Sequence, residues 1–127
     1  MIDDLFDNKM EKILKKRTKQ VAIDVWHNCQ KIDNKFYDFK RQLIRCSSSV
    51  GANYRAACRA KSDRDFLNKL KIVEEELDET MYFIELLCEI EPIQKKMWEN
   101  TFKESNELTA IMVASIGTIR EKLNQSK

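Results

Sequence analysis

Four arginines recur along one stretch of the chain at helical spacing. Arg41 and Arg45 are four residues apart, as are Arg55 and Arg59, and steps of three and four residues connect the two pairs. In a helix such residues share one face. Guanidinium groups form paired hydrogen bonds with phosphate oxygens, and their binding depends largely on counterion release and not on base sequence. The spacing therefore predicts a surface that follows a phosphate backbone.

Lysines before and after this stretch enlarge the basic region. Residues 1–62 carry 14 Lys and Arg against 7 Asp and Glu, whereas residues 63–127 carry 9 against 14. A cluster of lysines precedes the arginine row, at Lys12, Lys15, Lys16 and Lys19. The candidate nucleic-acid-binding residues are Arg41, Arg45, Arg55, Arg59, Lys61, Arg64 and Lys16. RNA and DNA are both open as ligands, because no base-reading motif accompanies the row.

An acidic cluster offers the arginines a different role. Glu74, Glu75, Glu76, Asp78 and Glu79 lie close together in the second half of the chain. They could pair with the arginines within a subunit or between subunits. The protein would then be a helical scaffold for protein partners, with no nucleic-acid contact. Both hypotheses stand on the sequence alone.

Residues for catalysis or metal binding are sparse. His27 is the only histidine, and no glycine-rich phosphate loop or nucleophile motif is present. The cysteines Cys29, Cys46, Cys58 and Cys88 are widely spaced and form no C-x-x-C pair. We therefore expect no enzymatic activity, no metal and no cofactor, and we expect reduced, core-filling thiols in a cytoplasmic protein.

The elements that carry these residues are long helices. The chain of 127 residues has two Gly, one Pro and 35% charged residues, a composition typical of helical proteins. Apolar residues at spacings of three and four predict helices at about 7–32, 35–61, 63–90 and 92–124. Asp33 and Ser62 read as N-caps and Pro92 as a first helical residue. We expect one all-α domain over residues 1–127, an up-and-down antiparallel four-helix bundle with no membrane span.

One polar residue falls on the apolar stripe of the second predicted helix. Asn53 follows Leu43 and Val50 and precedes Ala57 at helical spacing. A buried amide must find hydrogen-bond partners and can fix helix register. Ser49, one turn earlier, and a polar group on another helix are the expected partners, so Ser49 and Asn53 are interpreted as structural polar residues of the core.

Two features point beyond a self-contained bundle. Phe83, Leu86 and Ile90 form a second apolar stripe on the third predicted helix, which predicts an oligomer interface. Gly51 lies in a run of small residues, where glycine costs about 1 kcal/mol relative to alanine in a helix. Something must approach its backbone closely, and either tight packing within the subunit or an interface between subunits would explain it.

Three segments closely resemble the four-helix-bundle proteins encoded in 23S rRNA intervening sequences. They are RCSSSVGANYRAACRAKSDRDFL (45–67), KIVEEELDETMYFIELL (71–87) and SNELTAIMVASI (105–116), and the resemblance extends over roughly residues 10–123. It implies a homopentamer and kinship with the accessory variability determinant proteins of diversity-generating retroelements, which bind nucleic acid and a reverse transcriptase. The function expected from it is that of a non-enzymatic, oligomeric nucleic-acid-binding accessory factor.

Overall fold

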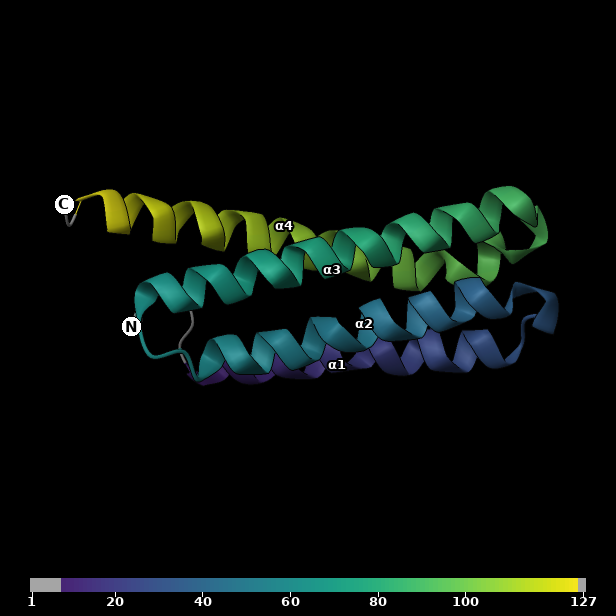
Figure 1. The fold of residues 1–127 in the computed structure, drawn as a ribbon, viewed down its shortest axis with the longest axis horizontal. Helices are drawn as coiled ribbons and strands as arrows, with labels where there is room; N and C mark the ends of the chain where they lie inside the picture. Colours follow the sequence, from purple (N-terminus) through teal and green to yellow (C-terminus); the bar gives the residue numbers. More distant parts are fainter. Residues whose placement is uncertain (1–7, 126–127) are drawn as a thin grey trace.

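The computed structural model describes residues 8–125, which form four α-helices and no strand. These are α1 (Asn8–Gln30), α2 (Tyr37–Cys58), α3 (Asp63–Ile90) and α4 (Lys95–Gln125), with 3-10 turns at Asn34–Phe36 and Pro92–Gln94. Successive helices run in opposite directions along an elongated bundle (Figure 1), which confirms the all-α prediction. The predicted start of the first helix at Asp7 lies outside the described residues.

Side chains at the predicted breaks cap the turns. Asp33 Oδ1 accepts a hydrogen bond from the Lys35 backbone N–H at 2.7 Å, and Ser62 Oγ accepts one from the Asp65 N–H at 3.1 Å. Both satisfy amide donors that the first turn of a helix leaves unpaired. Pro92 opens a 3-10 turn and not α4 itself, so α4 begins three residues later than predicted.

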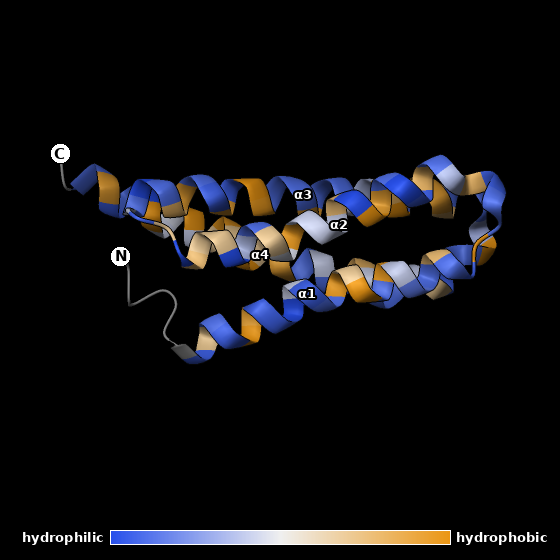
Figure 2. Cartoon of the chain, turned by 60° about the horizontal axis from the view of Figure 1, so that its bottom comes forward, coloured by the Kyte–Doolittle hydropathy of each residue, from blue (hydrophilic) through white to orange (hydrophobic). Residues whose placement is uncertain are grey.

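Every helix contributes apolar side chains to one core. Bands of hydrophobic and hydrophilic residues alternate along each ribbon in Figure 2, as expected for amphipathic helices. Leu14, Leu43, Leu70 and Leu108, one from each helix, are fully buried. None of the described helices has an 18-residue stretch apolar enough to span a membrane.

The core position predicted for Asn53 belongs to its neighbour. Tyr54 is fully buried in α2, whereas Asn53 is half-buried at the edge of the core. Asn53 Nδ2 does donate to Ser49, at 2.9 Å, but the acceptor is the backbone carbonyl oxygen. Steps of three and four residues both fit the spacing between Val50 and Ala57, and in the structure the buried stripe of α2 passes through Tyr54 and not Asn53.

Gly51 lies at a close approach of the backbones of α1 and α2. A Cβ atom at this position would lie 3.3 Å from the backbone nitrogen of Lys19 and 3.4 Å from the carbonyl carbon of Thr18. The close approach lies within one subunit, and the glycine needs no second copy to explain it. The absence of a side chain at Gly51 thus sets the spacing of the α1–α2 pair.

Candidate nucleic-acid interface

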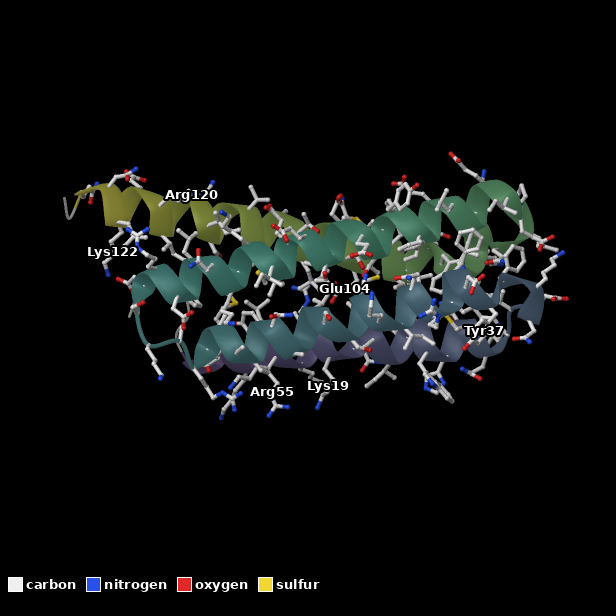
Figure 3. The ribbon with its side chains drawn as sticks, in the orientation of Figure 1. Lys19, Tyr37, Arg55, Glu104, Arg120 and Lys122 are labelled. Atoms are coloured by element: carbon white, nitrogen blue, oxygen red, sulfur yellow. The ribbon has the colours of Figure 1, made fainter. Side chains whose placement is uncertain are left out.

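The exposed edge between α1 and α2, here called the α1–α2 seam, holds a dense group of cations. A hollow of about 590 Å³ is lined by Lys12, Lys15, Lys16, Lys19, Gln20 and Arg55, and is called the basic hollow below. Lys12 and Lys19 each lie three and four residues from the adjacent Lys15 and Lys16, so α1 presents all four along one side. Lys19 and Arg55 project next to each other from the edge of the bundle in Figure 3.

Small side chains form the floor of the seam beside the basic hollow. Ala22, Ser48, Gly51 and Ala52 line an adjoining hollow of about 230 Å³, which shares Lys15, Lys19 and Arg55 with the first. The Thr18 hydroxyl, also in the floor, donates to the Leu14 carbonyl at 2.7 Å. The Thr18 hydroxyl therefore already has a hydrogen-bond partner within α1, and the charged groups of this hollow are those of Lys15, Lys19 and Arg55.

The charges of the basic hollow are largely unneutralised. Lys15 Nζ lies 3.1 Å from Glu11 Oε1. Among residues 8–125, no carboxylate lies within ion-pair distance of Lys12, Lys16, Lys19 or Arg55. Like charges held together without counterions raise the local positive potential and attract anions. This arrangement can bind phosphate groups.

Arg45 has a different environment although it belongs to the same arginine row. Its guanidinium pairs with Glu79 and, at 3.4 Å, with Glu76, both on α3. The hydrogen bond that Arg45 donates to Glu79, together with the two negative charges, raises the pKa of Arg45 above its ordinary value. For Arg45, the structure therefore supports the pairing hypothesis, and this residue is not a free phosphate ligand.

The other predicted cations are spread over the molecule. Arg41 lines a separate hollow of the α1–α2 seam, near the turn between these helices, with Tyr37 and Lys40. Arg59 and Lys61 are exposed in the connection from α2 to α3. Arg64 lies beside Arg120 between α3 and α4. The structure thus brings Lys16 and Arg55 together and separates them from the rest.

Sequence reasoning noticed some residues of the seam and missed others. Lys12, Lys15 and Lys19 were recognised as basic but not included among the candidate site residues. The aromatic side chains Trp26 and Tyr37 were not singled out, although both are at least half exposed, at 50% and 57%. Two helices joined by a short turn must be antiparallel, so pairing residues equidistant from the break at Asp33 and Asn34 would have placed Lys12 opposite Arg55.

Three of the predicted interface residues lie on α3, and the fourth, Gly51, lies on α2. Phe83 is half-buried and packs against Phe39 of α2, with ring centroids 6.4 Å apart. Leu86 is also half-buried, whereas Ile90 is 53% exposed at the end of α3. Part of the second apolar stripe is therefore covered within the subunit, and its exposed end lies at the α3–α4 turn.

A larger and more apolar groove runs between α3 and α4. Its volume is about 740 Å³, and Ile84, Cys88, Trp98 and Phe102 form its apolar lining. Charged side chains of both signs rim it: Lys95, Lys96, Lys103, Glu85 and Glu99. An apolar groove with charges of both signs at its rim is typical of surfaces that bind a protein segment, whereas a phosphate chain requires cations.

Two of the cysteines, Cys29 and Cys46, are buried, and Cys58 and Cys88 are half-buried. Burial raises the pKa of Cys29 to about 11, and it also raises the pKa of Cys46, Cys58 and Cys88. Thiolates are the nucleophilic and metal-binding form, so raised pKa values disfavour both roles. Within residues 8–125, no three His, Cys, Asp or Glu side chains are grouped closely enough to hold a metal ion.

Comparisons with known proteins agree with this architecture. The family model for the 23S rRNA-intervening sequence protein matches residues 10–114. A solved structure from Bacteroides thetaiotaomicron VPI-5482, described as a protein with unknown function from the S23 ribosomal protein family, is 30% identical to this chain, with a TM-score of 0.72. The match covers 84% of this chain and 97% of that one. Among curated proteins, no match was found.

Proposed function

Since the chain belongs to the 23S rRNA-intervening sequence protein family, we propose that it is a non-enzymatic nucleic-acid-binding protein whose contact surface is the α1–α2 seam. Binding is independent of base sequence because the seam offers cations and no arrangement for reading base edges. Its physiological role is that of an accessory factor for RNA or DNA. A reverse transcriptase as protein partner remains a prediction from the resemblance.

The observation that carries the proposal is the unneutralised charge of the basic hollow. Lys12, Lys16, Lys19 and Arg55 have no ion pair with the described residues, whereas Arg17 and Arg45 on the same two helices are both paired with carboxylates. Cations collected in one hollow repel each other unless an external anion accompanies them. A polyanion with closely spaced phosphates meets that requirement.

Self-association is part of the same proposal. Ile90 and the adjoining Ile93 are 53% and 89% exposed at the α3–α4 turn, and they offer apolar surface for contact with a second copy. Repeating the basic hollow on several subunits would multiply the number of phosphates bound by one particle. The homopentamer expected from the resemblance would be one such arrangement.

The test compares two triple variants with equal loss of charge. Lys12, Lys16 and Lys19 are replaced by Gln in one variant, and the exposed Lys95, Lys96 and Lys103 at the α3–α4 groove are replaced in the other. Fluorescence anisotropy with labelled RNA and DNA is measured from roughly 50 to 200 mM salt, and light scattering reports the mass of each variant. We expect the wild type to lose affinity steeply with salt.

The two variants should then differ. Loss of the three seam lysines should reduce the magnitude of the slope of log K against log salt concentration by about 2 to 3, because each phosphate contact contributes roughly 0.7 to 0.9 to that slope. The groove variant should bind as the wild type does. Equal weakening in both variants would mean that only net charge matters and would contradict a site at the seam. No binding by the wild type at 50 mM salt would reject the function.

The apolar groove between α3 and α4 supports a second candidate, a scaffold that binds a protein partner. Trp98 and Phe102 give this groove the aromatic content typical of protein interfaces. This function predicts that Phe102→Glu abolishes partner capture while nucleic-acid affinity is unchanged. The first function predicts the reverse pattern for the seam lysines. The two candidates use opposite sides of the bundle and are separable by these variants.

A further inference from the structure

An exposed tryptophan continues the line of seam lysines along α1. Trp26 follows Lys19 by seven residues, which is two helical turns on the same side of α1 and about 10 Å along its axis. Half of its surface is exposed, and its ring has an edge-on contact with His27 at 5.5 Å between centroids. The other tryptophan, Trp98, is buried and donates from Nε1 to Gln94 at 3.0 Å. Trp26 thus presents a large aromatic surface to solvent beside a row of cations.

A second exposed aromatic lies farther along the same seam. Tyr37 begins α2 and is 57% exposed, and it lines the hollow that also contains Arg41, Lys40 and Ile44. Along α1, Trp26 lies between the floor residue Ala22 and Cys29, which belongs to the Tyr37 hollow. From the start of α1 to its end, the seam therefore offers cations, then Trp26, then Tyr37 with Arg41.

We infer that the α1–α2 seam selects single-stranded nucleic acid, with phosphates on the basic hollow and an unpaired base stacked on Trp26. This inference rests on the proposed function and specifies its substrate. Proteins that hold single strands combine a positive groove with aromatic platforms, because each base presents a flat π surface once it leaves the duplex. In a duplex the base faces are stacked on each other and inaccessible to a side chain on a helix surface.

The acidic side of the bundle supplies a matched control. Tyr82 on α3 is 55% exposed, close to the exposure of Trp26, and its ring contacts Phe83. Its nearest neighbours in sequence on the exposed side of α3 are Asp78 and Glu85. Carboxylates repel the phosphates of a nucleic acid, so a bound strand should not reach Tyr82, and its replacement should leave binding unchanged.

The experiment measures binding of single strands of about 15 nucleotides, as RNA and as DNA, and of a duplex of equal length. The variants are Trp26→Ala, Trp26→Phe and Tyr82→Ala, and circular dichroism verifies their helix content. Trp26→Ala should weaken single-strand binding by about 5- to 100-fold, Trp26→Phe should restore most of it, and Tyr82→Ala should have no effect. Duplex binding should be the same in all three. In a Trp98→Phe background, single-strand addition should quench the fluorescence of Trp26.

The outcomes separate this inference from the proposed function. Unchanged single-strand affinity in Trp26→Ala, together with loss of binding in the variant lacking the seam lysines, would overturn the stacking inference and leave nucleic-acid binding intact. Duplex binding as tight as single-strand binding would also overturn it. Failure of the wild type to bind either form at low salt would remove both. Polyglutamate that competes as well as RNA would identify the seam as a site for acidic peptides and also contradict the inference.

Discussion

Arg45 and Arg55 lie on the same helix and the same predicted row, but the structure gives them opposite environments. Arg45 faces α3 and pairs with Glu76 and Glu79, whereas Arg55 faces α1 and meets Lys15, Lys16 and Lys19. The difference arises from the neighbouring helix and not from α2. A row of arginines on one helix therefore does not predict a binding surface unless the helices packed on either side of it are known.

The same contrast separates the two edges of α1. On the side of α4, Arg17 donates two hydrogen bonds to Glu104, at 2.8 Å from Nε and 2.6 Å from Nη2, and Nη2 donates a third to Glu107 at 3.0 Å. On the side of α2, the lysines have almost no acidic partners among the described residues. One edge of α1 is neutralised within the subunit, and the other is the edge that we propose as the ligand surface.

The largest effect is expected from a substitution that changes the spacing between α1 and α2 at the seam. Gly51→Leu should reduce the free energy of unfolding by about 2–3 kcal/mol, because the added side chain would meet the α1 backbone and not a flexible neighbour. Urea denaturation gives the measurement. Gly117 is the control, since a Cβ there has nothing within 4 Å, and Gly117→Ala should stabilise the protein by about 0.5–1 kcal/mol. A stable Gly51→Leu variant would show that α1 and α2 are not held at this distance.

A comparison of single arginine variants should give the next largest effect. Arg55→Gln should weaken RNA binding several-fold at low salt and lower the salt dependence by about 1, because it removes one phosphate contact. Arg45→Gln should leave affinity unchanged and reduce stability by about 0.2–1 kcal/mol, as expected for a surface ion pair. Anisotropy and urea denaturation measure both quantities for both variants. Equal loss of affinity would mean that the acids on α3 do not occupy Arg45 in solution.

Stability at acid pH should show the smallest effect. The hydrogen bond from Arg17 lowers the pKa of Glu104 below its ordinary value of 4.5. The ion pair therefore stabilises the fold above about pH 4.5 and loses this contribution as the pH falls through the lowered pKa. Glu104→Gln should reduce the free energy of unfolding by about 1 kcal/mol at neutral pH, and the difference from wild type should disappear at low pH. A difference that persists at low pH would assign the effect to packing.

The helices were predictable because their signals are local. Ser62 and the apolar spacing of 63–90 gave the bounds of α3 as the structure has them. The site was less predictable, because it depends on how helices face one another. Asn53 was assigned to the core in place of Tyr54, because both positions fit steps of three and four between Val50 and Ala57. Trp26 was overlooked, because residue type alone does not show which aromatic side chains are exposed. The acids that occupy Arg45 were recognised as possible partners, but only the packing of α2 on α3 selects which arginine they reach.

The raised pKa values of the four cysteines have a practical consequence for chemical labelling. Burial raises the pKa of these thiols, so thiol-directed reagents should react with them more slowly than with an exposed cysteine of ordinary pKa. Ser48 is exposed in the floor of the seam, and a cysteine introduced there would have lysines nearby to favour its thiolate. Such a variant would accept a fluorophore or a cross-linker selectively, without removal of the native cysteines. The path of a bound strand could then be mapped from the nucleotides that the probe reaches.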